Sequence, residues 1–322
     1  MQWIVPPSIF FQRGMLICKH SFDAPINKTN LRKFRAHFGT SPGVCALLWN
    51  RIQPNLNIPG GASFLHLLWA LLFMKTYGTE ENLSSKVKVD EKSYREKIWP
   101  TIVAISGLKD YVVSAICVSS SVFLFRLQSN LTFGKIKFSN RLMNQNGSCC
   151  LMSVDGTDFQ ILEPNPFWRG WFSHKFKGPG LRYEVAICIQ TGWIVWVNGP
   201  FAAGHWNDVK IFKGWLKQLL YPGEKVEADN GYPDEKVSRP DQNCSNYANY
   251  LCKADVRGRH ETVNRRFKQF QCLKQVFRHD KQKHVHCFNA VAVITQLLIE
   301  NGEPLYQVYY RSVHTAYHTI NN

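Results

Sequence analysis

The order of secondary structure in the second half of the chain constrains the fold most. From residue 149 onward the hydrophobic pattern predicts three strands, a helix, a further strand, a long loop and two helices. The strands at 181–190 and 193–198 are joined by Thr191-Gly192, a two-residue hairpin turn that pairs them antiparallel. A strand after the helix at 205–220 can join the same sheet through a crossover. We therefore expect an α/β fold, a mixed sheet flanked by helices.

The residues ahead of this sheet predict helices. Residues 31–38 have the spacing of a short amphipathic helix that ends at Gly39, and Thr40-Ser-Pro42 supplies a hydroxyl N-cap with proline at the first helical position. Further apolar helices are expected at 64–77 and 90–105. Two short helices joined through a glycine turn are compatible with a helix-turn-helix and equally with a plain helical hairpin.

These patterns divide the chain into five segments. They are a poorly defined leader at 1–30, a helical region with a helix-turn-helix-like pattern at 31–111, an irregular insertion or linker at 112–147, the α/β domain at 148–306 and a tail at 307–322. Residues 113–137 have mixed polarity without a clear period, and one hypothesis is that they are translated intron.

Composition narrows the class of partner. The formal net charge is +16, from 39 Lys and Arg against 23 Asp and Glu, which favours a polyanion such as nucleic acid. An apolar fraction of 45% excludes wholesale disorder. The ten cysteines include no C-x-x-C pair, which argues against a structural zinc site and favours reduced thiols. Without a basic signal sequence or an apolar stretch of about 20 residues, we expect a soluble protein with no membrane partner.

Three carboxylates occupy positions that a sheet of this kind would bring close together. Asp155 follows the first strand, Asp229 follows the strand at 225–228, and Glu261 falls in the first turns of the helix at 258–276. Strand ends in an open α/β sheet meet in one crevice, and a packed helix can bring a third acid there. Each acid alone also fits a turn or a favourable helix-terminal charge. Asp208, near a helix start, and Asp158 are alternative acids.

Convergent carboxylates repel one another unless a cation neutralises them. Hard oxygen ligands select Mg²⁺ or Mn²⁺, and two such ions promote in-line displacement at a phosphodiester. The acids and the basic net charge therefore point to the same substrate, DNA or another nucleic acid.

Several motifs in this order resemble the PIF/Harbinger group of DDE transposases, over residues 149–305. The segments that carry the resemblance are Val154-Asp-Gly-Thr157, 179–185, Gly199-Pro200, 207–212, Ala228-Asp-Asn-Gly-Tyr232 and Arg259-His-Glu-Thr-Val-Asn264. The resemblance implies an RNase H-like fold and an enzyme that cleaves ester bonds of DNA with an Asp-Asp-Glu triad and two divalent ions. The triad falls on Asp155, Asp229 and Glu261, since the RNase H-like order puts the second acid after the strand that follows the helix.

The helix that carries Glu261 is also basic. Arg257 and Lys268 complete an Arg-x3-Glu-x6-Lys pattern that resembles a signature of related transposases, although the tyrosine of that signature is replaced by Ala254. We expect five basic side chains to contact DNA phosphates, with a solvated basic face as the alternative. They are Arg257, Arg259, Arg265, Lys268 and Lys274.

The resemblance further implies work in the nucleus on transposon ends and target DNA, with a separate DNA-binding partner protein and a homo-oligomer as further expectations. The alternative function is a domesticated or decayed DNA-binding protein without nuclease activity. Six tryptophans, at 168, 171, 193, 196, 206 and 215, have mostly core-like spacing, so we expect burial rather than stacking on bases.

Overall fold

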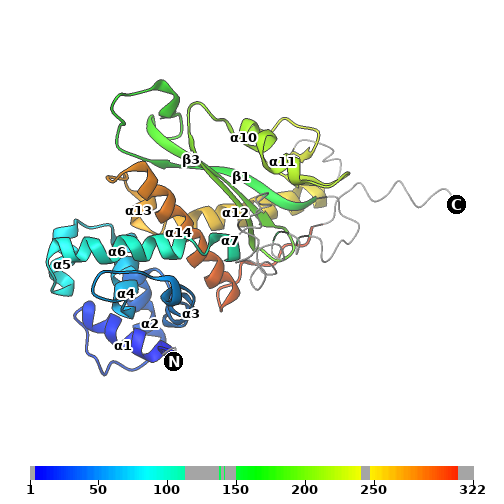
Figure 1. The fold of residues 1–322 in the computed structure, drawn as a ribbon. Coiled ribbons are helices and arrows are strands. Elements are labelled where there is room, and N and C mark those ends of the chain that lie inside the picture. Colours follow the sequence, from blue (N-terminus) through cyan, green and yellow to red (C-terminus); the bar gives the residue numbers. More distant parts are fainter. Residues whose placement is uncertain (1–3, 113–137, 139–140, 142–149, 241–246, 311–322) are drawn as a thin grey trace. The chain divides into compact units, whose positions relative to one another are not determined.

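The computed structural model describes residues 4–112, 138, 141, 150–240 and 247–310. The chain forms two compact units: a helical unit of residues 1–109 and 266–303, and a sheet unit of residues 110–265 and 304–322 (Figure 1). The insertion expected at 112–147 and the tail at 307–322 lie largely outside the described residues. The expected α/β domain at 148–306 differs from the sheet unit because residues 266–303 cluster with the N-terminal helices.

The helical unit confirms the predicted helices and adds others. It contains α1 (Pro7–Ile17), α2 (Lys28–Phe38), α3 (Pro42–Ile52), η1 (Gln53–Asn55), α4 (Phe64–Thr76), α5 (Glu80–Val87), α6 (Glu91–Ser106), α13 (Gln271–Lys274) and α14 (Lys281–Glu300). α7 (Lys109–Val112) follows α6. As expected from the Thr40-Ser-Pro42 motif, the Ser41 hydroxyl accepts the Val44 N–H at 3.3 Å and begins α3.

The leader expected to be poorly defined contains α1, which packs through aromatic rings. Phe10 and Phe11 are fully buried, and the Phe11 ring stacks on Phe34 of α2. A Cβ on Gly14 would lie 2.3 Å from that same Phe34 ring, so only glycine permits the approach of α1 to α2. The sequence pattern of residues 1–30 did not reveal α1, because its packing partner Phe34 lies some twenty residues further along the chain.

The sheet unit contains the mixed sheet that the pattern predicted. Its strands are β1 (Cys150–Gln160), β2 (Phe172–Ser173), β3 (Gly178–Cys188), β4 (Ile194–Ala202), β5 (Lys225–Glu227) and β6 (Val237–Ser238), and η2 (Arg169–Trp171) precedes β2. The order is β2-β3-β1-β5-β6, and β4 also pairs with β3. β3 pairs antiparallel with β1 and β4, whereas β5 pairs parallel with β1 and β6. The core includes Met152, Val154, Val195, Phe212 and Val226.

Three boundaries in the sheet unit differ from expectation. β1 continues beyond Asp155 to Gln160, because residues 156–160 pair in register with the start of β3. The helix expected at 205–220 is two helices, α10 (Asp208–Gly214) and α11 (Leu216–Leu219), which break at Trp215. α12 (Tyr247–Phe267) begins well before 258 and ends before 276, so Glu261 lies within its second half rather than in its first turns.

A buried ion pair ties the residues ahead of β1 to the loop before β5. Arg141 Nε and Nη2 donate to Glu224 Oε1 and Oε2 at 2.8 and 3.1 Å, and the two side chains are only 1% and 4% exposed. The Arg141 guanidinium also donates to the Phe138 carbonyl at 2.6 Å and lies over the Phe138 ring. Burial of both ions makes the pair costly to break from one side.

We expect Glu224→Ala to lower the free energy of unfolding by about 3–5 kcal/mol, because it leaves the Arg141 guanidinium buried without its counter-ion. Urea denaturation measures the change. Glu235→Ala is the matched control, since its exposed carboxylate pairs with Lys217 at the surface and its loss should cost less than about 1 kcal/mol. Equal losses in the two variants would contradict a structural role for the buried pair.

Candidate active site

Asp155 lies in the middle of β1, opposite Val185 of β3. Its partly buried carboxylate accepts a hydrogen bond at 2.9 Å from the Asn264 side chain of α12. A second contact joins the same two elements, because Ser153 Oγ lies 3.0 Å from His260 Nδ1. These contacts hold α12 against β1, and Glu261 is the residue next to His260 on that helix.

The parallel pairing of β1 with β5 brings Asp229 beside Asp155. Ser153 of β1 pairs with Glu227 of β5, and each acid lies two residues further along its own chain segment. Neighbouring strands are about 4.8 Å apart. Asp229 lies just past the end of β5, and its carboxylate is near enough to add to the raised pKa of Asp155. The exposed Asp229 carboxylate accepts the Gly231 N–H at 2.9 Å, which is the turn geometry that the Asp-Asn-Gly sequence predicted.

Asp208 reaches the same place from α10. Asn207 caps this helix by accepting the Lys210 N–H at 3.0 Å, which makes Asp208 its first residue. A Cβ on Gly156 would lie only 1.8 Å from Asp208 Oδ1. The Asp155-Gly156 pair that suggested a turn therefore serves another purpose: the missing side chain at 156 lets Asp208 contact β1 directly after Asp155.

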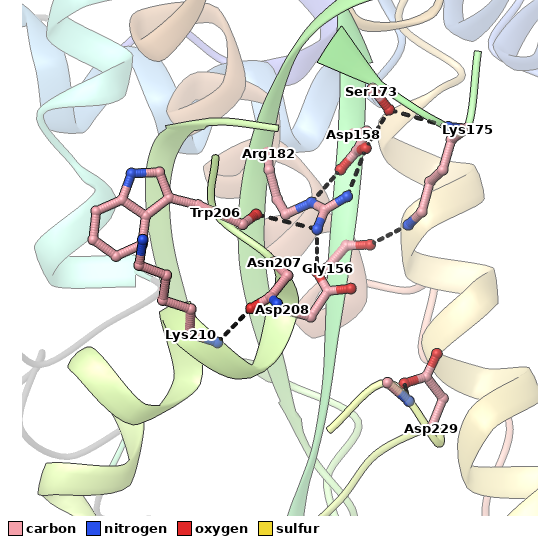
Figure 2. Close-up of polar contacts among 11 residues, drawn as sticks. Gly156, Asp158, Ser173, Lys175, Arg182, Trp206, Asn207, Asp208, Lys210 and Asp229 are labelled. Atoms are coloured by element: carbon pink, nitrogen blue, oxygen red, sulfur yellow. Dashed lines mark hydrogen bonds and ion pairs between the residues drawn. The ribbon is translucent and has the colours of Figure 1, made fainter. Parts of the chain in front are cut away.

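Arg182 of β3 links Asp208 to Asp158 (Figure 2). Its Nε and Nη2 donate to the Asp158 carboxylate at 2.7 and 2.9 Å, and Nη1 lies 3.3 Å from Asp208 Oδ1. The Ser173 hydroxyl donates to Asp158 at 2.6 Å. Asp158 is 4% exposed and both of its oxygens are engaged, so it holds Arg182 rather than facing the other acids. Of the two alternative acids, the structure brings Asp208 into the cluster and keeps Asp158 behind it.

The acids act on one another electrostatically. Burial raises the pKa of Asp155 to about 7, and the carboxylates of Asp208, Glu261 and Asp229 add to the rise. The Lys175 ammonium, which donates to the Gly156 carbonyl at 2.8 Å, acts in the opposite direction. The pKa of Asp208 is also raised, first by burial, against the effect of Arg182 and Lys175.

This donor set suits a hard divalent cation, because it consists of carboxylate and amide oxygens whose mutual repulsion a cation would relieve. Asn264 Oδ1 is buried without a hydrogen bond, and the buried Asp208 Oδ1 has only its ion pair with Arg182. Within the part of the chain that the structure describes, however, no three His, Cys, Asp or Glu side chains are grouped closely enough to hold a metal ion. Glu261 and Asp229 are exposed, so core packing does not prevent their side chains from turning toward an ion beside Asp155, although Asp229 would give up its hydrogen bond from Gly231.

The basic side chains expected at DNA phosphates are placed differently from one another. Arg259 is buried, and its guanidinium donates to the Cys188 and Ile189 carbonyls at the end of β3, which corrects the expectation that it contacts DNA. Arg257 is partly buried and Arg265 is exposed on α12. Lys268 and Lys274 are exposed but belong to the helical unit. The sequence pattern around Arg257 and Glu261 gave no sign that Arg259 is buried, because the carbonyl groups that accept its hydrogen bonds lie about seventy residues away in the chain.

Sequence reasoning missed Glu184, which is a buried acid of β3 near the cluster. Its Oε2 accepts the Trp196 indole N–H at 2.9 Å, while Oε1 is buried without a hydrogen bond. Burial raises the pKa of Glu184 to about 8, the indole opposes the rise, and Asp208 adds to it. A charged residue within the apolar run of β3 was the only signal in the sequence.

We expect stability to fall as the pH rises from about 5 to 8.5, in part through Glu184. The folded protein keeps this proton to a higher pH than the unfolded chain, so deprotonation opposes folding across that window. Urea denaturation measures the free energy of unfolding at pH 5 and at pH 8.5. Between these pH values the wild type should lose on the order of 2–3 kcal/mol more of this free energy than Glu184→Gln. Parallel pH profiles for the two proteins would contradict a raised pKa at Glu184.

Comparison of the chain with protein-family models, with curated proteins and with solved structures gives no match. No helix among the described residues is long and apolar enough to cross a membrane.

Proposed function

We propose that this chain is a metal-dependent DNA nuclease and strand transferase of the DDE type, with an RNase H-like sheet. The main support is the register of β1 and β5: Ser153 pairs with Glu227, and Asp155 and Asp229 each lie two residues further along, Asp229 in the loop that follows β5. Asn264 ties the helix that carries Glu261 to the first of these acids. The resemblance of the surrounding motifs to PIF/Harbinger transposases supports the same assignment.

In this proposal Asp155, Asp229 and Glu261 would hold two Mg²⁺ or Mn²⁺ ions, and Asp208 would be a fourth acid beside them. When bound, such ions activate the attacking oxygen and stabilise the leaving oxygen of the phosphodiester. The Asn264 amide orients the Asp155 carboxylate through its 2.9 Å hydrogen bond. Lys175, fixed on the Gly156 carbonyl, provides a positive charge at the edge of the acids where a DNA phosphate can lie.

Asp208 is positioned by two independent constraints. The Arg182 guanidinium balances part of its charge, and the absence of a side chain at Gly156 leaves room for its carboxylate. The proposed substrate is DNA at transposon ends and at the target, in the nucleus. A separate DNA-binding partner protein and a homo-oligomer belong to the same proposal.

A second candidate is a transposase-derived DNA-binding protein without nuclease activity. It is favoured by the lack, among the described side chains, of a ready group of three metal ligands. The two candidates differ in whether the acids support cleavage, so a cleavage assay separates them.

We expect purified protein to nick supercoiled plasmid DNA in the presence of Mg²⁺ or Mn²⁺ and not in EDTA. Asp155→Asn, Asp229→Asn and Glu261→Gln should each lower the nicking rate by roughly a hundredfold or more, because each removes a charged metal ligand. Glu163→Gln, an exposed acid of the same unit, is the matched control and should leave the rate unchanged. Metal-independent nicking, or full activity in the three variants, would contradict the assignment; binding without nicking would support the second candidate.

A separate prediction concerns Asp208. Gly156→Ala should lower nicking about as much as Asp208→Asn, since the added methyl group would displace the Asp208 carboxylate. Thermal unfolding of both variants checks that the fold is intact. If Gly156→Ala cleaves like the wild type while remaining folded, the close contact between Asp208 and β1 has no part in the reaction.

A further inference from the structure

The sheet unit exposes aromatic side chains that were expected to be buried. Trp168 is 49% exposed and Trp215 is 36% exposed, whereas Trp196 is buried at 8% and fits the expectation. Monomeric proteins rarely leave several tryptophans at one surface without a function, because an exposed aromatic ring forfeits a large burial energy. A cluster of such rings at one surface therefore points to a binding site.

These rings contact one another in a chain of tilted and edge-to-face pairs, and we call this cluster the aromatic platform: Trp168, Phe201, His205, Trp206 and Trp215. The ring centroids of neighbours along it are 4.8–5.6 Å apart. They come from the loop before η2, the end of β4, the loop before α10 and the break between α10 and α11. At the break between α10 and α11, the Trp215 ring contacts Phe201 and Trp206.

Positive charge lies within the platform. The Lys210 ammonium is 4.4 Å from the centroid of the Trp206 ring and 3.3 Å from His205 Nε2, and Figure 2 shows its side chain extended over the indole. Arg169 is exposed directly after Trp168. Aromatic faces interleaved with cations suit a ligand that has both planar rings and negative charges, which describes an unpaired stretch of nucleic acid.

The platform is fixed to the candidate active site by Arg182. The same Nη1 atom that pairs with Asp208 also donates to the Trp206 carbonyl at 3.2 Å. Only Asn207, the cap of α10, separates Trp206 from Asp208 in the chain. A base on the neighbouring Trp215 would therefore be held near the acids.

We propose that the aromatic platform binds an unpaired DNA segment by stacking its bases on the exposed tryptophan rings, while Lys210 contacts a neighbouring phosphate. The inference rests on the proposed function for the choice of DNA, and it adds that the strand is unpaired beside the site of cleavage. A protein partner is less well matched, since the Lys210 ammonium and the His205 imidazole interrupt the apolar surface.

Binding of the full chain in EDTA tests this inference without any cleavage. Fluorescence anisotropy would compare a labelled oligothymidylate with a duplex of the same number of phosphates. Trp168→Ala and Trp215→Ala should each weaken binding of the single strand roughly tenfold, with a change in duplex binding of less than about threefold. Trp168→Tyr should restore binding, since it keeps an aromatic face. Tyr309→Ala, which removes an aromatic ring that is 87% exposed outside the platform, is the matched control.

An equal loss for single strand and duplex, or no loss in the folded Trp168→Ala protein, would overturn the inference. Analytical ultracentrifugation tests whether a second copy of the chain covers the platform instead. If the tryptophan variants abolish self-association and leave single-strand affinity unchanged, the platform is a contact between copies, and the inference is overturned. Selective single-strand binding without nicking would reject the proposed nuclease activity but not the platform. Nicking with unselective binding would reject only the platform.

Discussion

The candidate site depends on one backbone constraint, the parallel pairing of β1 with β5. The pairing of Ser153 with Glu227 fixes the register, and two residues further along each segment stands an acid, Asp155 or Asp229. This register is set by the buried residues on either side, since Met152, Val154 and Val226 all belong to the core. Full burial of each such side chain contributes about 1.5–3 kcal/mol and so opposes the repulsion between the carboxylates that the same pairing brings together.

The sheet unit limits that repulsion with fixed cations. Arg182 donates two hydrogen bonds to Asp158 and lies 3.3 Å from Asp208, and the Lys175 ammonium opposes the rise in the pKa of both Asp155 and Asp208. The pKa of Asp155 nonetheless remains about 7, chiefly because the carboxyl group is buried, and the neighbouring acids add to the rise. An incompletely neutralised group of acids is what a cation-binding site requires in the absence of its cation, because a fully paired carboxylate has no charge left to offer.

Local structure followed from the sequence wherever neighbours along the chain decide it. The Ser41 cap and the helices at 64–77 and 90–105 depend on spacing or on residues within a few positions, and they agree with the structure. The antiparallel hairpin around Thr191-Gly192 also forms, but its connection is longer than two residues, because Trp193 pairs with Cys188 rather than with Gln190. The three acids could also be singled out, since each follows an apolar run or sits on a basic helix. The fold class came from the order of these elements.

Other features were decided by partners far away in the chain. β1 continues through Asp155-Gly156 because β3 supplies hydrogen-bonding partners about thirty residues later, which a turn-forming dipeptide does not reveal. Arg259 turned inward to carbonyls of β3, and α1 folded onto Phe34. The exposure of Trp168 and Trp215 also depended on packing, since spacing alone does not show whether a neighbouring element covers a ring. The sequence by itself thus determined which elements form and which acids to consider, whereas tertiary structure decided what those side chains face, because burial and pairing are properties of residues that meet only after folding.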